Sequence, residues 1–107
     1  MIGWRLDMIN QHFLDVFNSN IKRLRQIVPV VARVHGEHHP EFYKVKALFD
    51  ELDHHYSLNK DVNLIDIFTS LKLVSNNYQI PDDVCETYEA VYVMLSQLDE
   101  AYGSQSE

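Results

Sequence analysis

The stretch NNYQIPDDVCETYEAVYVMLSQLDEAY, residues 76–102, decides the fold of this chain. Pro81 has no backbone N–H to donate, so a preceding helix is expected to stop before it and the next to begin at Asp82 or Asp83. Asp83 and Glu86 have the spacing of a capping box, with both carboxylates at the positive end of the helix dipole. Apolar residues then recur at steps of three and four, which predicts an amphipathic helix of about 20 residues. Its apolar side comprises Val84, Cys85, Tyr88, Val91, Tyr92, Leu95, Leu98 and Tyr102.

A first helix is predicted from the opposite end of the chain. Its apolar side comprises Leu6, Ile9, Phe13, Val16, Phe17, Ile21, Leu24, and Ile27 or Val28. Pro29 is expected to kink this helix or to restart it, because an interior proline removes one backbone hydrogen bond and clashes with the carbonyl four residues back. The second piece, residues 30–35, is expected to end at Gly36, which suits a C-terminal cap.

Two shorter helices are predicted in between. Pro40 suits the first turn of the second helix, whose inward side comprises Phe42, Val45, Leu48, Phe49, Leu52, His55 and Tyr56. Residues 57–63 are polar and form the expected turn. The third helix is expected to run from about Leu64 to Tyr78, with Leu64, Ile67, Phe68, Leu71, Val74 and Tyr78 facing inward. Four amphipathic helices with short connections predict an all-α, up-and-down four-helix bundle.

Length and composition agree with a single helical domain. The chain has 107 residues, of which 46% are apolar, so residues 1–107 are expected to share one core, with residues 103–107 as a frayed tail. No run alternates with period two for long enough to predict a sheet. A single cysteine excludes an intramolecular disulfide, and there is no basic-plus-apolar leader or long apolar run. A cytoplasmic protein with no membrane partner is therefore expected.

Charge is distributed unevenly along the chain. Residues 1–50 carry seven Lys/Arg against five Asp/Glu, a balance of +2, while residues 51–107 carry two against eleven, a balance of −9. An acidic half repels phosphate backbones, so no nucleic-acid partner is expected. The basic residues Lys22, Arg23, Arg25 and Arg33 are most simply a solvated helix face. The acidic half instead suits a basic protein partner.

Three stretches resemble a known family. VARVHGEHHPEF (residues 31–42), LFDEL (48–52) and NNYQIPDDVCETYEAVYVMLSQLDE (76–100) are together similar to the hemerythrin-like domain of the RIC family, the di-iron proteins linked to repair of iron–sulfur centres under nitrosative and oxidative stress. The likeness covers roughly residues 6–102. It implies a hemerythrin-like bundle with a carboxylate-bridged di-iron site, which needs inward-pointing His and Glu from all four helices.

Most of the family's metal ligands have no counterpart in this chain. The positions that align with them hold Leu14, Asn59, Asn63, Asp61 and the segment of Gln105 and Glu107. Only His35 matches a family histidine, and one ligand does not hold two irons. The resemblance therefore implies a bundle that has lost its site, with no metal and no cofactor expected. If iron binds at all, the candidates are His35, Asp61 and His39.

The other histidines and the cysteine allow weaker hypotheses. Two clusters, His35, Glu37, His38 and His39, and Asp53, His54 and His55, have the residue types of a small zinc or iron site. Neighbouring helix residues point about 100° apart, so surface or structural roles are favoured, with His55 a hydrogen-bonded core residue. Cys85 is expected to be buried on the apolar side, the alternative being a reactive thiol at a helix start. The six tyrosines are expected in the core and its rim.

The sequence is compatible with three functions. The favoured one is a non-catalytic, metal-free hemerythrin-like bundle that acts through protein–protein contact as a regulator, adaptor or inhibitor. The alternative is a diverged, iron-binding member of the iron–sulfur cluster repair family with a role in the stress response. The third is an enzyme of another class, but no catalytic triad, glycine-rich phosphate loop or CxxC pair supports it. A homodimer is also open, because a small bundle gains core by pairing.

Overall fold

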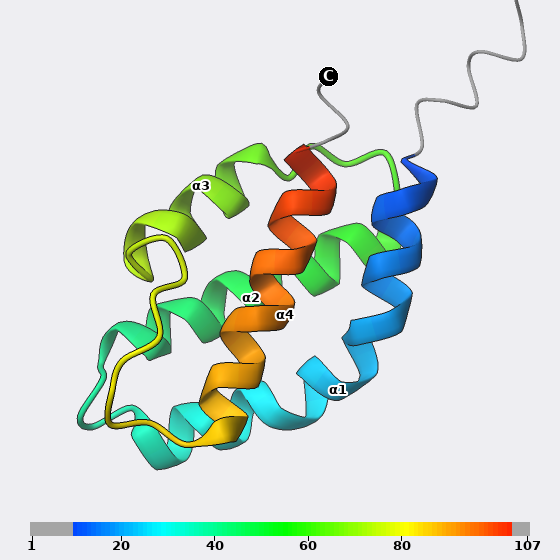
Figure 1. Cartoon of the computed structure of the whole chain (residues 1–107). Coiled ribbons are helices and arrows are strands. Elements are labelled where there is room, and N and C mark those ends of the chain that lie inside the picture. Colours follow the sequence, from blue (N-terminus) through cyan, green and yellow to red (C-terminus); the bar gives the residue numbers. More distant parts are fainter. Residues whose placement is uncertain (1–9, 104–107) are drawn as a thin grey trace, which may run out of the picture.

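The computed structural model describes residues 10–103, which form four helices. They are α1 (Gln11–His35), α2 (Glu41–Leu58), α3 (Ile65–Val74) and α4 (Glu86–Gly103). Helix α1 packs against both α2 and α4, and α3 packs against α2 (Figure 1). The part of the chain that the structure describes contains no β-strand. The predicted all-α four-helix bundle is confirmed.

Helix α1 is long and bent. Asn10 is its N-cap, and its side-chain oxygen accepts a hydrogen bond from the backbone N–H of Phe13 at 3.1 Å. The helix continues through Pro29, so the expected restart is wrong, but Figure 1 shows the expected kink as a bend where the ribbon turns from blue to cyan. A proline inside a helix bends it without ending it when the flanking turns stay packed. The predicted inward residues Leu6 and Ile9 lie outside the described residues.

The core consists of the apolar sides of all four helices, as the spacing predicts. Its largest fully buried side chains are Tyr56, Tyr88, Tyr92, Phe13, Phe42, Phe49, Leu24, Leu52, Leu64, Leu71, Leu95 and Leu98. One inward prediction on α2 is wrong, because His55 is exposed and its ring lies 5.3 Å from that of His54. The buried positions Leu52 and Tyr56 are one turn apart, and this rotates position 55 toward solvent.

Helices α2 and α3 end at different places from those predicted. Helix α2 runs to Leu58, so the turn comprises residues 59–64 and not 57–63. Helix α3 ends at Val74, not Tyr78. The backbone N–H of Asn77 donates to the carbonyl of Lys72 at 2.7 Å, and that of Asn76 to Leu73 at 3.4 Å. These two bonds form a Schellman motif, which stops the helix.

Three consecutive residues after α3 adopt left-handed backbone angles. Asn76, Asn77 and Tyr78 have φ of 55°, 61° and 61°. Asparagine tolerates this region, whereas tyrosine requires compensation. The Tyr78 N–H donates to Ser75 Oγ at 2.8 Å, and its hydroxyl donates to the Asp99 carboxylate at 2.7 Å. The α3–α4 loop is therefore anchored on α4 by its own strained residue.

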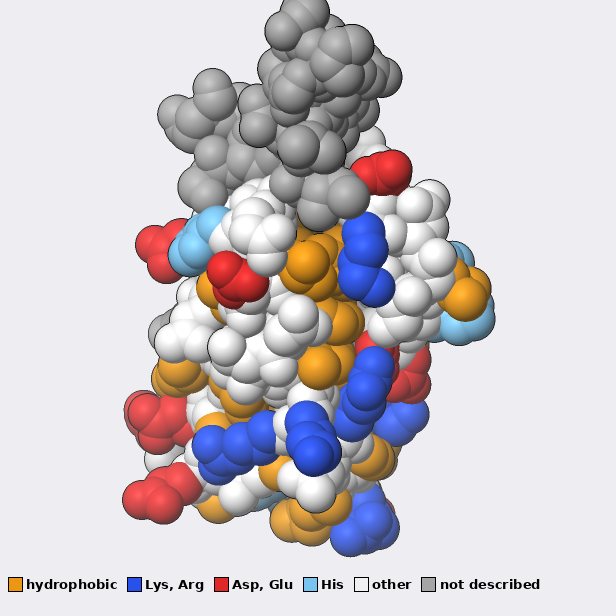
Figure 2. Space-filling model, turned by 90° about the vertical axis from the view of Figure 1, so that its right-hand side faces the viewer, with side chains coloured by type: hydrophobic (Ala, Val, Ile, Leu, Met, Phe, Trp, Pro, Cys, Tyr) orange, Lys and Arg blue, Asp and Glu red, His pale blue; other side chains and the backbone are white. Residues whose placement is uncertain are grey.

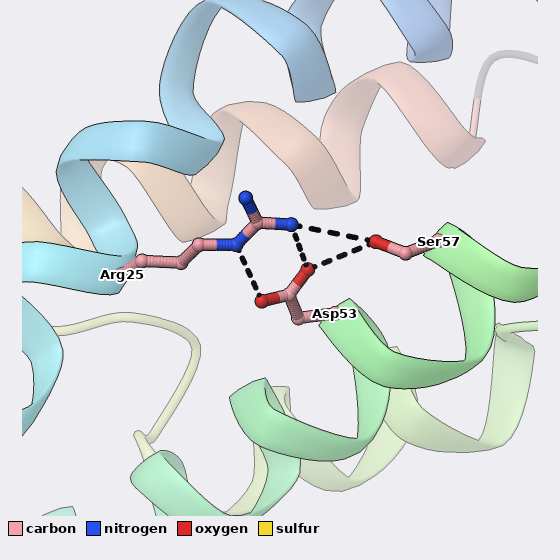
Figure 3. A network of polar contacts seen from close by, with 3 residues as sticks. All are labelled: Arg25, Asp53 and Ser57. Atoms are coloured by element: carbon pink, nitrogen blue, oxygen red, sulfur yellow. Dashed lines mark hydrogen bonds and ion pairs between the residues drawn. The ribbon is translucent and has the colours of Figure 1, made fainter.

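Arg25 and Asp53 form an ion pair that joins α1 to α2 (Figure 3). The guanidinium donates from Nε and Nη2 to the two carboxylate oxygens, each at 2.8 Å, and the Ser57 hydroxyl donates to the same carboxylate at 3.1 Å. The Arg25 guanidinium holds the pKa of Asp53 below its usual range. This ion pair links the two helices at the protein surface.

Replacing Asp53 by asparagine should lower the free energy of unfolding at pH 7 by about 0.5–1 kcal/mol, because Arg25 is 51% exposed and solvent screens the pair. Since the folded pKa is depressed, the contribution is fully present above the unfolded pKa of about 3.9 and is lost as the pH falls through the folded value. Urea unfolding at pH 7 and pH 3 checks this. Asp50→Asn, which removes the exposed α2 pair with Lys46, is the control. If the loss of unfolding free energy caused by Asp53→Asn is as large at pH 3 as at pH 7, the prediction is contradicted.

Lys and Arg side chains gather on the face shown in Figure 2, on the α1 side of the molecule. The α1 residues Lys22, Arg23, Arg25 and Arg33 are all exposed. Of these, Arg25 is engaged with Asp53, so the cluster is only partly a free solvated face. Within residues 10–103, no helix has both the length and the apolar character to cross a membrane.

Candidate functional site

The α1–α2 turn and the start of α4 meet at one end of the bundle (Figure 1). The turn is tight: the N–H groups of His38 and His39 both donate to the carbonyl of His35, at 3.1 and 2.8 Å. Gly36 caps α1 as predicted but with a right-handed φ of −58°. It is needed for space, because a Cβ here would overlap the Tyr43 ring and the Ala32 carbonyl.

We call this end of the molecule the acidic end, because it carries six carboxylates from two stretches of the chain, residues 37–41 and 82–89. They are Glu37, Glu41, Asp82, Asp83, Glu86 and Glu89. Between residues 10 and 103, the ion pairs to these carboxylates come from His39, whose Nε2 lies 3.0 Å from Asp83 and whose Nδ1 lies 3.4 Å from Glu41. Within the described residues, most of these carboxylates are therefore not engaged in an ion pair.

The predicted capping box at the start of α4 is wrong. Helix α4 begins at Glu86, and the backbone N–H of Glu89 donates to the carbonyl of Cys85 at 3.1 Å. Asp83 lies in a turn outside the helix, where it contacts His39. The loop from α3 must cross the end of the bundle before α4 can start, and this draws Asp83 away from the helix.

Tyr88 lies beneath the acidic end and supports both histidines. It is fully buried, and its ring centroid lies 5.4 Å from that of His35 and 5.6 Å from that of His39. Its hydroxyl donates to that of Tyr92 at 3.2 Å. Burial, and then the charges of Glu41 and Asp83, raise the pKa of Tyr88, so the phenol stays neutral at physiological pH. The imidazoles of His35 and His39 therefore pack against a rigid, buried aromatic ring.

A pocket of about 460 Å³ opens beside His39. Its acidic lining residues are Glu41 and Asp82, and its amides are those of Asn76 and Gln79. Carboxylate and amide oxygens are acceptors. The pocket thus has the chemistry to receive a lysine or arginine side chain.

Cys85 lies next to His35, and the expectation that it is buried is wrong. The thiol is exposed, and its Sγ lies 3.2 Å from Nε2 of His35. The apolar spacing counted Cys85 as part of α4, but the helix starts one residue later, so the inward side begins at Tyr88. The structure thus brings a thiol and an imidazole together, which sequence spacing did not predict.

The residues proposed for iron are not brought together. His35 and His39 lie at the acidic end, whereas Asp61 shares a pocket with Asn10 and Tyr102 at the opposite end of α1. At about 1.5 Å per residue, a helix of 25 residues would separate these ends by more than 30 Å if straight. Among residues 10–103, no group of three or more His, Cys, Asp or Glu could hold a metal ion.

The other positions aligned with family ligands have local roles. Asn59 and Asn63 lie in the exposed α2–α3 loop, where their side-chain oxygens accept from the N–H of Asp61 at 3.0 Å and of Ile65 at 2.9 Å. Leu14 is half-buried on α1. Gln105 and Glu107 lie outside the described residues. In the second proposed cluster, Asp53 is engaged by Arg25, and His54 and His55 are exposed.

Comparisons of the chain with models of known protein families, with curated proteins and with solved structures give no match. The fold and the site define an all-α four-helix bundle with an acidic end that contains three histidines and a thiol.

Two contacts of this end could not be found from sequence spacing. His39 and Asp83 are 44 residues apart, and His35 and Cys85 are 50 residues apart. The sequence did carry one hint of these contacts. In each pair, both residues lie close to an end of a predicted helix. A bundle brings the boundaries of alternate connections to the same end.

Proposed function

We propose that the chain is a non-catalytic, metal-free bundle of hemerythrin-like type that acts through protein contact, and that the acidic end binds a Lys- or Arg-rich segment of another protein. The observation that carries this is the convergence of six carboxylates from two distant stretches of the chain, residues 37–41 and 82–89, whose ion-pair partner within residues 10–103 is His39. Folding has not neutralised these charges, so they remain available to an external cation.

The pocket beside His39 supports the same proposal. Glu41 at the start of α2 and Asp82 in the α3–α4 loop both line it, so one inserted side chain would contact both. An arginine or lysine there gains charge-assisted hydrogen bonds, which are about twice as strong as neutral ones. Iron binding has less support, because its candidate ligands lie at opposite ends of α1.

The test is binding of a fluorescent Lys-rich peptide, followed by anisotropy at low and at high salt. Neutralising Asp82, Glu86 and Glu89 to the matching amides should weaken binding about tenfold at low salt, because electrostatic complementarity dominates such a contact. This variant keeps Glu41 and Asp83, which hold His39.

The matched control neutralises Glu51, Asp66 and Glu100, three exposed carboxylates elsewhere, and changes the net charge equally. It should weaken binding much less than the first variant, and by less than about twofold at about 0.15 M salt, where the Debye length is about 8 Å and remote charges are screened. Equal weakening by both variants contradicts a localised site. Stoichiometric iron retained by untagged protein contradicts the metal-free part of the proposal.

A further inference from the structure

We propose that Cys85, paired with His35, is a site of thiol–disulfide exchange that prefers disulfides carrying positive charge. The thiol is exposed, and its sulfur lies 3.2 Å from the imidazole Nε2. Exchange requires a thiolate, an acceptor for its proton and access to an external sulfur. A proton acceptor beside the sulfur and access from solvent are both present at this position.

His35 is held in place for this role. It is the last residue of α1, and its ring lies edge-on to that of Tyr88 at 87°. Tyr88 is fully buried and cannot move aside without disturbing the core. A nucleophile beside an oriented base is the arrangement that activates cysteine in proteins.

The start of α4 supplies a second favourable feature. The Cys85 carbonyl accepts the N–H of Glu89, so the cysteine immediately precedes the helix. Free backbone N–H groups at a helix N-terminus stabilise negative charge nearby. Cys85 is thus the residue before the positive end of α4, and its sulfur contacts an imidazole.

The proposed step balances without any further reagent. The Cys85 S–H proton passes to His35 Nε2, and the thiolate attacks one sulfur of the external disulfide. A new S–S bond forms as the old one breaks, and the leaving thiolate takes the proton from the imidazolium. Cys85 is oxidised to a mixed disulfide, and the external disulfide is reduced to one thiol.

The surroundings of the thiol set the charge preference. Asp83 and Glu86 flank Cys85 in sequence, and Glu41 and Asp83 both contact the neighbouring His39. A negative surface concentrates cations and repels anions. Cystamine, a small dication, should therefore react faster than 3,3′-dithiodipropionate, a dianion of similar size.

The experiment measures mixed-disulfide formation by mass spectrometry at pH 7 with cystamine. His35→Gln should slow the reaction at least tenfold, because proton transfer by a positioned base contributes at least that much. His38→Gln is the matched control, since His38 is exposed and lies in the same turn, where its backbone N–H donates to the His35 carbonyl; it should stay within about twofold of wild type. Cys85→Ser should form no adduct. Equal rates for wild type and His35→Gln overturn the proposal.

A second measurement on the unaltered chain keeps the test valid if His35→Gln does not fold. The rates with cystamine and with 3,3′-dithiodipropionate are each divided by the rate of the same reagent with a short, uncharged cysteine peptide. The normalised ratio should favour cystamine by about tenfold at low salt and fall toward one at high salt. A ratio of one at low salt overturns the charge preference. Peptide binding at the acidic end is a separate readout, so either proposal can fail without the other.

Discussion

Phe13→Ala should lower the free energy of unfolding by about 3–5 kcal/mol, the largest effect expected from a single substitution in this protein. The Phe13 ring centroid lies 5.0 Å from that of Tyr56, 5.1 Å from Tyr102 and 6.0 Å from Phe68. These partners come from α2, α4 and α3, so one side chain on α1 contacts the other three helices. Truncating it removes buried area and leaves a cavity that rigid rings on three sides cannot fill.

Urea unfolding followed by circular dichroism measures this loss. Phe13→Leu is the control, because it keeps an apolar side chain of intermediate size and should cost about half as much or less. A loss below about 1 kcal/mol for the alanine variant would show that Phe13 does not join the four helices, since a typical surface change stays within that range.

Leu71→Ala and Leu73→Ala should differ sharply although they lie two residues apart on α3. Leu71 is 0% exposed and Leu73 is 78% exposed. Loss of the buried leucine should cost about 2–5 kcal/mol through lost transfer free energy and a cavity. Loss of the exposed one should cost less than about 0.5 kcal/mol. Both positions hold leucine on the same helix, with the same helix propensity. A difference in stability between the two variants therefore comes from packing.

The two leucine variants also test whether the short helix α3 unfolds cooperatively with the rest of the bundle. Helix α3 packs mainly against α2, and it contacts α4 through the Lys72–Asp99 pair and the Phe68–Tyr102 rings. If α3 detached independently, Leu71→Ala would leave the main unfolding transition in place and expose the amides of α3 to early hydrogen exchange. We expect a single transition shifted to lower urea, with all four helices exchanging together.

Much of the core followed from periodicity along the chain. Steps of three and four residues identified Phe13, Phe42 and Tyr88 as inward, because helix geometry ties side-chain direction to sequence spacing. Pro40 and Gly36 marked the turn between α1 and α2, because proline restricts the backbone and glycine is common at helix ends, although Gly36 here serves by leaving space for the Tyr43 ring. These are local properties and require no tertiary information.

Helix ends were less predictable, because two local signals competed. Asp83 had the spacing of a cap, yet it lies outside α4 and contacts His39. Asn76 and Asn77 had the residue type that tolerates left-handed angles, and they stopped α3 one turn early. The length that the loop needed to cross the end of the bundle decided between these signals.

The candidate site was decided by tertiary structure. The pairs His39–Asp83 and His35–Cys85 join residues 44 and 50 positions apart. Both depend on which connections the packing of α1 against α2 and α4 brings to one end. Periodicity states which side of a helix is apolar, but the position of one helix along another is set by interlocking side chains such as Tyr88 and Phe42, whose rings lie 5.0 Å apart. A contact between two loops therefore emerges only when the core that positions them has formed.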